Sequence, residues 1–341
     1  MPSNIICLMK TAIVSGATGQ TASYLIEILL EKGYKVYGIR RRASTFNTER
    51  IDHLYSDPHV SDRLELVYGD LADYSSISNL VSDIKPDLFF NCGAMSHVRI
   101  SFDIPEYTYD VTGTGVVRCL ESIKKQSPQT RFLTMSSSEM FGTSPPPQNE
   151  NTPFQPCSPY AVAKITGYWS VKLYRSAYGL FATNAICFNN ESPRRGGNFL
   201  TRKISRGATR IKYGLQNKLY LGNLLAKRDW GHAKDTADAL YKIIMAESPS
   251  DYVVATGEMH SVQEFLELVF SKLDLDWKKY VEIDSRYFRP LEIDALCGDP
   301  TKIKTELNWE PKFSFIQLVD DMVKNDLKLA MKEKLVKESV E

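Results

Sequence analysis

A tyrosine and a lysine four positions apart, Tyr160 and Lys164, are the residues best suited to chemistry in this sequence. On a helix, this spacing puts both side chains on one face, one turn apart. A free phenol has a pKa of about 10, which is too high for a base at neutral pH. Because a neighbouring ammonium stabilises a phenolate, we expect Lys164 to lower the pKa of Tyr160. The tyrosine could then accept a proton from a hydroxyl group while a hydride leaves the same carbon.

A hydroxyl and a carboxylate, Ser137 and Glu139, follow an apolar run that is typical of a strand. Hydride transfer by itself needs no second base, so Glu139 suggests that a second proton is abstracted. The competing interpretation is a serine cluster that caps a helix, with Glu139 in solvent. Without Tyr160 and Lys164 in the same chain, that second interpretation would be preferred.

A glycine-rich turn near the N-terminus has the spacing of a phosphate cradle. Gly16 permits the tight turn, and Gly19 lets the backbone approach a pyrophosphate. Ala22 stands where the following helix packs closely on a sheet, and a methyl group is tolerable there. The helix would offer free N–H groups and a partial positive charge to an anion.

The end of the next strand indicates which dinucleotide would bind. An NAD site requires an acid there, whereas this chain has the cations Arg40–Arg42. Three guanidinium groups favour the 2′-phosphate of NADP over the alternative of a solvated basic loop. Asp70 and Leu71 follow the third strand and are expected near the adenine, although Asp70 could also cap the next helix.

The apolar pattern predicts a scaffold that brings these candidates to one edge. Strand-like and helix-like segments alternate through the first 190 residues. The expected strands are 11–15, 35–39, 64–68, 88–91, 132–135 and 181–188, and the expected helices include 74–84, 109–125 and 160–178. This alternation predicts an α/β fold, a Rossmann-type doubly wound parallel sheet with helices on both faces. Ligands bind beyond the carboxyl ends of such strands, where all these candidates fall.

The second half predicts a smaller, mixed α/β lobe that binds the substrate. Residues 1–188 are assigned to the NADP-binding domain, and segments near 220–256 are expected to return to it. Residues 189–331 form the interleaved lobe, in which Ser261 and Glu264 have the spacing of a helix capping box. Residues 332–341 are mostly charged and are expected to form a frayed tail. Trp169, Phe188 and Trp230 are interpreted as packing residues.

The bulk composition excludes several classes of protein. The formal net charge is +1, so no strong field would recruit nucleic acid or a membrane surface. The apolar run at residues 5–9 is too short for a signal sequence or a membrane span. The six cysteines form no C-x-x-C pair and the five histidines have no metal-ligand spacing. We therefore expect a reducing, cytoplasmic compartment and no metal site.

Together, the motifs resemble the extended short-chain dehydrogenase/reductase family, through Gly16-x-x-Gly19-x-x-Ala22, Ser137-x-Glu139 and Tyr160-x-x-x-Lys164. Longer stretches are similar to its GDP-mannose 4,6-dehydratase branch: residues 41–47, 93–98, 188–196 and 226–232. The similarity runs from about residue 10 to about residue 327. Four positions depart from the usual pattern: Ala22 for Gly, Met95 for Gln, Ser137 for Thr and Asn190 for His.

The resemblance implies a dehydration of GDP-mannose in which NADP is regenerated. Tyr160 removes the proton of the C4 hydroxyl as hydride passes to NADP⁺, Lys164 holds the nicotinamide ribose, and Ser137 hydrogen-bonds the C4 oxygen. Glu139 takes the C5 proton as water leaves from C6, and the hydride returns to C6. The resemblance also implies a homodimer or homotetramer, in which the loop of residues 41–47 meets a neighbouring subunit's cofactor.

The resemblance also assigns binding roles residue by residue. The expected cofactor contacts are Gly16, Ala17, Thr18, Gly19, Gln20, Thr21, Arg41, Arg42, Ser44, Asp70, Leu71, Gly93, Ala94, Ser96, Tyr107, Lys164, Asn190 and Arg195. The expected substrate contacts are Ser96, Glu139, Asn189, Asn198, Lys203, Gly222, Arg228, Arg289 and Glu292. The arginines suit a diphosphate because a guanidinium can bind phosphate through two hydrogen bonds.

Two kinds of alternative function stay open at this point. A C4 epimerase or an NADPH-consuming 4-keto reductase would use the same fold, and the reductase activity could coexist with dehydration. Glu139 speaks against a pure epimerase, which needs no base at C5. A non-catalytic nucleotide sensor would need only the dinucleotide cradle, and not the four side chains Ser137, Glu139, Tyr160 and Lys164 together.

Overall fold

The computed structural model describes residues 9–57, 61–288 and 290–339. Its centre is a seven-stranded sheet in the order β11-β6-β5-β4-β1-β2-β3, in which all neighbouring strands are parallel. These strands are β1 (Thr11–Ser15), β2 (Lys35–Arg40), β3 (Leu64–Tyr68), β4 (Leu88–Asn91), β5 (Arg131–Ser137), β6 (Ala182–Cys187) and β11 (Tyr252–Val254). The order reverses between β1 and β4, as in a Rossmann-type sheet. The predicted fold class is confirmed.

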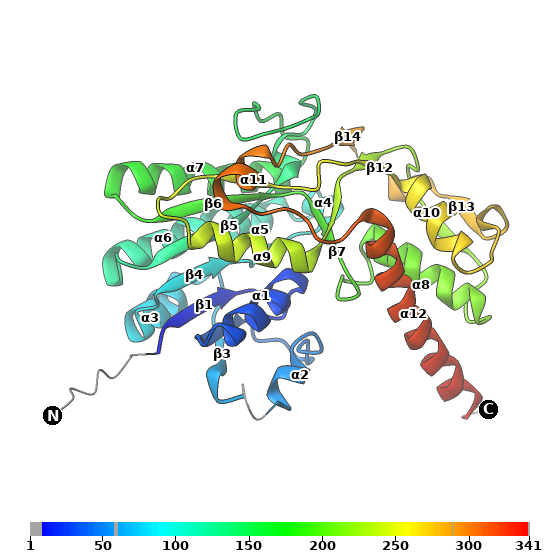
Figure 1. The fold of residues 1–341 in the computed structure, drawn as a ribbon, viewed down its shortest axis with the longest axis horizontal. Helices are drawn as coiled ribbons and strands as arrows, with labels where there is room; N and C mark the ends of the chain where they lie inside the picture. The colour runs from blue at the N-terminus through cyan, green and yellow to red at the C-terminus, as the bar shows by residue number, and fades with distance from the viewer. Residues whose placement is uncertain (1–8, 58–60, 289, 340–341) are drawn as a thin grey trace.

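Both faces of the sheet are buried, because alternate residues of each strand enter different cores. In β1, Ala12 and Val14 belong to one core and Ile13 to the other. The first core contains the apolar faces of α1 (Gln20–Glu31), α9 (Ala233–Ile244) and α11 (Thr301–Leu307). The second contains those of α3 (Tyr74–Ile84), α6 (Gly115–Gln126) and α7 (Pro159–Tyr178). Figure 1 shows α1 and α9 in front of the strands, with α3, α6 and α7 toward the left.

A smaller lobe lies beside the sheet, on the right of Figure 1. Its core joins α8 (Leu200–Lys212), α10 (Val262–Ser271) and α12 (Phe315–Glu338) through side chains such as Ile204, Phe265 and Met322. Three small sheets complete it: β7 (Asn189–Glu191) with β10 (Trp230–His232); β8 (Leu219–Leu221) with β13 (Val281–Ile283); and β9 (Lys227–Arg228) between β12 (His260–Ser261) and β14 (Ala295–Leu296). The capping box of Ser261 and Glu264 begins α10 as predicted.

The chain crosses between the two parts more than once. It leaves the sheet after β6, builds β7 to β10 in the lobe, and then returns through α9 and β11. Short elements connect the main ones: α2 (Asp52–Tyr55), α4 (Val98–Ser101), α5 (Pro105–Thr108), a π-helix η2 (Tyr109–Thr114), and the 3-10 turns η1 (Ser61–Arg63), η3 (Ser138–Met140), η4 (Trp277–Lys279) and η5 (Ser285–Tyr287). This crossing brings residues from both halves of the chain to one edge of the sheet.

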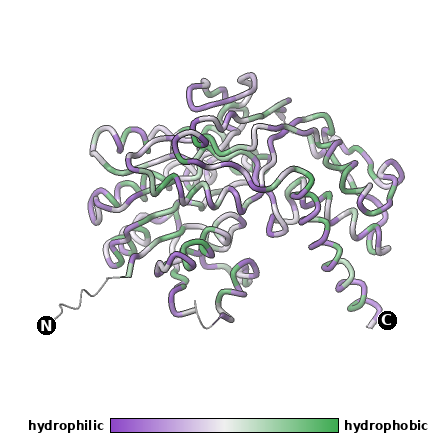
Figure 2. Tube along the Cα trace, in the orientation of Figure 1, coloured by the Kyte–Doolittle hydropathy of each residue, from purple (hydrophilic) through white to green (hydrophobic). Residues whose placement is uncertain are grey.

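Two expectations about packing are wrong. Residues 332–338 do not fray: they continue α12, whose residues alternate between hydrophobic and hydrophilic (Figure 2), and Glu333 forms an ion pair with Arg210 of α8. A long helix that begins at a capping box and packs on α8 has tertiary support that a local charge pattern does not reveal. Trp169 is not a core residue either, because 55% of its surface is exposed on α7. Phe188 and Trp230 are buried as expected.

Candidate active site

The glycine-rich turn lies where the strand order reverses, between β1 and the first turn of α1. Gly16 has φ +65°, and a Cβ there would come within 2.9 Å of the Gly93 Cα. Gly19 is the N-cap of α1, and neither a side-chain cap nor an acidic residue occupies the first turn. The free N–H groups and the positive end of the helix dipole are therefore available to an anion. This cradle fits the pyrophosphate of a dinucleotide.

The loops after β2, β3 and β4 surround this turn. Arg41 donates a hydrogen bond to the phenol oxygen of Tyr107 on α5. Arg42 and Ser44 are exposed in the same loop. Asp70 accepts from the backbone N–H of Ala72 at 2.9 Å, and a Cβ at Gly93 would meet the Leu71 side chain at 2.9 Å. The cap of α3 is Asp73 and not Asp70, so the alternative role for Asp70 as a helix cap is wrong.

The loop after β4 is tied to its neighbours through backbone groups. Gly93 donates its N–H to the Ser15 hydroxyl at 3.1 Å, and Ser15 donates to the Asn91 side chain at 2.6 Å. Met95 donates its N–H to the hydroxyl of Thr112, which belongs to the π-helix η2. Ala94 and Ser96 lie in this loop. The segment is therefore held close to the cradle from two sides.

The four candidate catalytic side chains come together at the ends of β5 and β6. Ser137 closes β5, Glu139 lies in the short helix η3 that follows, and Tyr160 and Lys164 occupy the first turns of α7. All four are buried, with Glu139 only 5% exposed. The Ser137 hydroxyl accepts the Glu139 backbone N–H at 3.2 Å and also shares a hydrogen bond with the Tyr160 phenol. A phenol, a hydroxyl and a carboxylate are thus available in one buried site.

Burial decides the protonation of the phenol. The pKa of Tyr160 is raised to about 12, chiefly because burial disfavours the phenolate. The hydrogen bond from Ser137 and the charge of Arg195 favour the phenolate, whereas the negative charge of Glu139 opposes it. The tyrosine is therefore a neutral hydrogen-bond donor and acceptor at neutral pH in this structure.

Lys164 does not act on Tyr160 in the way that its spacing suggested. Its ammonium donates to the backbone carbonyl of Met135 on β5 and lies 5.7 Å from the centroid of the Tyr160 ring. Burial lowers its own pKa to about 8, and the nearby thiols of Cys187 and Cys92 oppose that change. The expectation that Lys164 lowers the pKa of Tyr160 is therefore wrong for this structure, because desolvation outweighs the charge.

The segment that follows β6 borders the site from the lobe. The side-chain oxygen of Asn189 is buried and has no hydrogen-bond partner. Asn190 instead accepts a hydrogen bond from Thr21 on α1 at 2.7 Å. Arg195 pairs with the buried Glu191 at 3.1 Å, and burial raises the pKa of that carboxyl. A buried acceptor without a donor costs about 1–3 kcal/mol, so Asn189 suits a ligand hydroxyl or N–H group.

The remaining substrate candidates line the lobe. The Lys203 ammonium lies 3.4 Å from the centre of the Tyr287 ring, and a Cβ at Gly222 would come within 2.9 Å of the Tyr287 carbonyl oxygen. Arg228 is buried in β9 and donates to the Ile293 carbonyl at 2.9 Å, next to Glu292. Asn198 lies in the loop before α8. Arg289 falls outside the described residues.

Three residues that the sequence did not single out hydrogen-bond the loops around the glycine-rich turn. Arg50 donates to the Thr18 carbonyl at 3.2 Å and to the Arg194 carbonyl at 2.6 Å. Its pKa is lowered, first by burial and then by three neighbouring arginines. Arg118 donates to the Leu71 carbonyl at 2.9 Å, and Thr112 holds Met95. No spacing rule identifies them, because each bonds a residue distant in the sequence.

The described part of the chain holds neither a metal-binding cluster nor a membrane-spanning helix. No three histidine, cysteine, aspartate or glutamate side chains there come together as a metal site. Over the same residues, no helix combines the length and apolarity that crossing a bilayer requires.

The sequence matches known proteins along nearly its whole length. A family model described as GDP-mannose 4,6 dehydratase matches residues 13–322. GDP-mannose 4,6 dehydratase 1 of Arabidopsis thaliana is 52% identical over 340 residues, covering 98% of this chain and 94% of the plant protein. The GDP-mannose 4,6 dehydratase of Homo sapiens is 47% identical over 342 residues, covering 94% of this chain and 92% of the human protein.

Solved structures of lower identity share the fold. The dTDP-glucose 4,6-dehydratase of Bacillus anthracis, in complex with NAD, aligns with a TM-score of 0.81 at 22% identity, over 94% of this chain and 97% of that one. The UDP-glucose 4-epimerase of Thermus thermophilus, also in complex with NAD, aligns with a TM-score of 0.79 at 22% identity, over 93% and 98%. These likenesses concern the arrangement of the chain and not its chemistry.

Proposed function

The chain belongs to the GDP-mannose 4,6-dehydratase family, and from that premise we propose that it is a lyase that converts GDP-mannose into GDP-4-keto-6-deoxymannose and water. The observation that carries this proposal is that Tyr160 and Glu139 are both buried and both contact Ser137. The carboxylate lies close enough to raise the phenol's pKa. A reaction that removes protons from two different positions of a sugar needs two such groups beside each other.

The cofactor that we propose is NADP, held by the turn from Gly16 to Gly19. The uncapped N-terminus of α1 suits its pyrophosphate. The loop after β2 carries Arg41 and Arg42 at the place where an acid would select NAD, so these cations suit the 2′-phosphate. When bound, NADP supplies a hydride acceptor and donor beside the sugar. The loop after β4 and Lys164 border the same space and would orient it.

Tyr160 and Ser137 handle the C4 hydroxyl of the sugar in this proposal. Their mutual hydrogen bond lets Ser137 hold the C4 oxygen while Tyr160 receives its proton. Because burial keeps the phenol protonated, the proton-accepting form is a minor species at neutral pH. The groups that favour that form are Ser137 and Arg195. Oxidation at C4 leaves a ketone, which makes the C5 proton acidic.

Glu139 performs the elimination. Its carboxylate takes the C5 proton and can then deliver that proton to the C6 hydroxyl, which leaves as water. The C5 and C6 carbons gain a double bond at this stage. The hydride removed from C4 would then return to C6, and C5 would take up the proton removed from the C4 hydroxyl, so that only water is lost. Because the site is buried, both proton transfers occur away from bulk water.

The GDP portion is proposed to lie along the lobe. The orphaned oxygen of Asn189 accepts from a sugar or ribose hydroxyl, and Lys203 and Arg228 supply positive charge for the diphosphate. Tyr287 fixes the position of Lys203 through its ring. The substrate roles of Asn198, Gly222, Glu292 and Arg289 are carried over from the family resemblance.

We further propose that the chain forms a homo-oligomer in the cytoplasm. One face of α7 exposes Val162, Trp169 and Leu173, which recur at helical spacing. An exposed apolar stripe of this kind is typical of a surface that a second subunit covers. The five cysteines within the described ranges are free thiols, which suits a reducing compartment. The loop of residues 41–47, with Phe46 exposed, is the candidate for a second contact that would give a tetramer.

The test is incubation with GDP-mannose and NADP⁺, followed by mass spectrometry of the sugar nucleotide. The proposal expects a product lighter by one water, with no net reduction of NADP⁺. Net accumulation of NADPH without loss of water would indicate a simple dehydrogenase and contradict the proposal. Oxidation of added NADPH by the isolated product would reveal a second, 4-keto reductase activity. Binding of both nucleotides without any turnover would favour a sensor.

A further inference from the structure

The segment that leads from the sheet into the lobe lies against the first turn of α1. Gln20, the first residue of α1, reaches this segment with both ends of its side-chain amide. Its nitrogen donates to the Asn190 backbone carbonyl at 2.9 Å, and its oxygen accepts from the Ser192 hydroxyl at 2.7 Å. Gln20 and Ser192 are buried, so both hydrogen bonds are shielded from water.

Asn190 strengthens the same junction. Its side-chain oxygen accepts from the Thr21 hydroxyl at 2.7 Å and from the Gln20 amide at 3.2 Å. Its side-chain nitrogen donates to the Phe188 carbonyl at 3.3 Å. We call the contacts among Gln20, Thr21, Asn190 and Ser192 the amide clamp.

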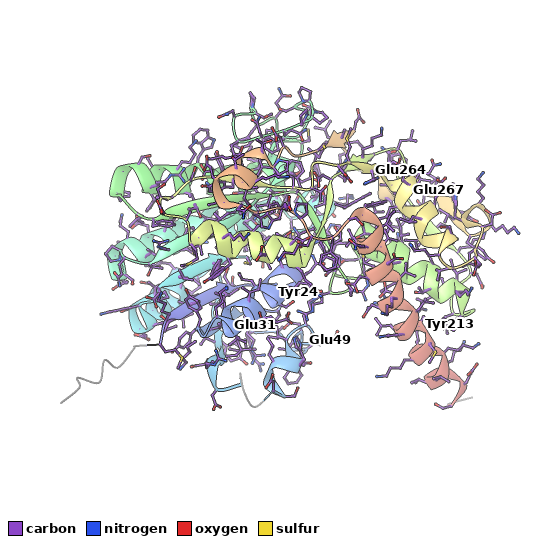
Figure 3. All side chains as sticks on the ribbon, viewed as in Figure 1. Tyr24, Glu31, Glu49, Tyr213, Glu264 and Glu267 are labelled. Atoms are coloured by element: carbon purple, nitrogen blue, oxygen red, sulfur yellow. The ribbon has the colours of Figure 1, made fainter. Side chains whose placement is uncertain are left out.

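The next turn of α1 carries a second set of contacts to the same segment. Arg194 donates to the Ser23 hydroxyl at 3.0 Å, pairs with Glu27 at 2.6 Å, and lies 4.0 Å from the centre of the Tyr24 ring. Figure 3 labels Tyr24 and Glu31 and shows that the N-terminal half of α1 lies nearer to the lobe than its C-terminal end. The segment and the helix therefore form one connected unit.

The two ends of this unit serve different ligands. One end is the uncapped N-terminus of α1, which suits dinucleotide phosphates. The other is β7, in which Asn189 presents its orphaned oxygen and pairs in register with Trp230, two residues beyond Arg228. Moving the first turn of α1 must therefore move β7, because the buried hydrogen bonds of the amide clamp join them.

From this geometry we infer that Gln20 is a positioning residue that couples dinucleotide binding at α1 to binding of the nucleoside diphosphate sugar at β7. The inference rests on the proposed function, because it needs both ligands. Gln20 suits the role because an amide donates and accepts at the same time. A glutamate of the same shape accepts only, and it would face the carbonyl and side-chain oxygens of Asn190.

The test measures thermodynamic coupling between the two sites by titration calorimetry. NADP⁺ is titrated into the protein with and without saturating GDP, and the ratio of the two dissociation constants is the coupling. Because coupling is reciprocal, GDP titrated with and without NADP⁺ must give the same ratio. We expect GDP to tighten NADP⁺ binding by at least about fivefold in the unmodified protein. Gln20→Glu and Asn190→Ala should bring that ratio below about twofold.

Gln148→Glu is the matched control. Gln148 is another buried amide that joins distant segments, through the Ser144 carbonyl at 2.8 Å and the Cys297 N–H at 3.0 Å, and it makes no contact with α1. This variant should keep the coupling of the unmodified protein. Thermal unfolding establishes that each variant is folded, and Ser192→Ala replaces any clamp variant that is not.

Two outcomes overturn the inference. One is that both ligands bind the unmodified protein and the ratio is one. The other is that folded clamp variants keep the full ratio. Failure of the unmodified protein to bind NADP⁺ or GDP would instead contradict the proposed function, so the two failures are distinguishable.

Discussion

The Lys164 ammonium lies 5.7 Å from the centre of the Tyr160 ring and donates its hydrogen bond to a backbone carbonyl of β5, not to the phenol. The two side chains share one face of α7, yet burial shifts both pKa values toward the neutral form. Burial raises the pKa of Tyr160 to about 12 and lowers the pKa of Lys164 to about 8. Desolvation, and not the charge of the neighbour, dominates this pair.

Replacing Lys164 by methionine should stabilise the protein at neutral pH, on the order of 1–2 kcal/mol, while lowering activity. The folded pKa of about 8 is below the ordinary 10.5, so charging Lys164 opposes folding below pH 8. Between pH 8 and 10.5 the unfolded chain binds more protons, so the unmodified protein gains stability relative to the variant. Denaturant unfolding from pH 7 to 9.5 measures this difference. A stability advantage of the variant that grows with pH would contradict the desolvation of Lys164 as its cause.

Tyr160→Phe should lower kcat by about 10²–10⁴-fold, because the acceptor for the C4 proton is lost. In the unmodified enzyme, kcat/KM should rise from pH 7 to 9.5 as the reactive phenolate becomes more abundant, and the variant should lack this rise. Tyr168→Phe is the control, because Tyr168 is a buried phenol of α7 whose pKa burial also raises. Equal pH profiles for Tyr160→Phe and the unmodified enzyme would exclude Tyr160 as the base.

Glu139→Gln should lower the rate of water loss about 10²–10⁴-fold and leave the affinity for NADP⁺ unchanged. The amide has the shape of the carboxylate but cannot take the C5 proton. Product analysis by mass spectrometry and calorimetric binding measure the two effects. Glu150→Gln is the matched control: Glu150 is partly buried, accepts the Val253 N–H at 2.7 Å, and burial raises its pKa. Unimpaired dehydration by Glu139→Gln would contradict the assignment of Glu139 as the base that takes the C5 proton.

Replacing both Arg41 and Arg42 by alanine should weaken NADP⁺ binding at least about tenfold and leave NAD⁺ binding nearly unchanged. The 2′-phosphate alone distinguishes the two dinucleotides, and guanidinium groups are its natural partners. Titrations with each dinucleotide give the selectivity. Arg99→Ala, in an exposed ion pair with Asp103, controls for the general loss of positive charge. An equal loss of affinity for NADP⁺ and NAD⁺ would show that these arginines do not distinguish the two dinucleotides.

Trp169→Glu combined with Leu173→Glu should convert the homo-oligomer into smaller species, because charges on the exposed stripe of α7 must be desolvated on association. Light scattering after size-exclusion chromatography measures the mass of the particle. Ile316→Glu changes an equally exposed apolar residue of α12 and should leave the mass unchanged. An unmodified protein that is monomeric would refute the proposed oligomer directly.

Local patterns sufficed for most of the scaffold. The β-forming run around Ile13 predicts a strand, and helix spacing identifies α7 from Tyr160 onward. Gly16 and Gly19 predict the turn because their spacing, between a strand-like run and a helix-like run, is typical of a phosphate cradle. These features depend on residues close in the sequence, so they can be derived before any fold is known.

Two expectations failed and one supporting residue was missed, because each depends on distant neighbours. The charged tail after residue 331 continues as helix, supported by the pairing of Glu333 with Arg210. Trp169 is exposed, although its hydrophobicity suggested a core position. Arg50 supports the cradle through the Thr18 carbonyl, and no motif marked it. In each case the deciding contact or its absence involves residues far apart in the chain.

The α/β architecture, the glycine cradle and the set of side chains at the sheet edge therefore follow from local patterns, because periodicity, turn chemistry and helix spacing are local properties of the chain. How those side chains are charged and what holds them depends on the packing of distant segments. The pKa of Tyr160 follows from the depth at which α7 is buried, and the junction of Gln20 with Asn190 follows from the return of the chain past α1. Desolvation and long-range hydrogen bonds arise only when distant segments pack together.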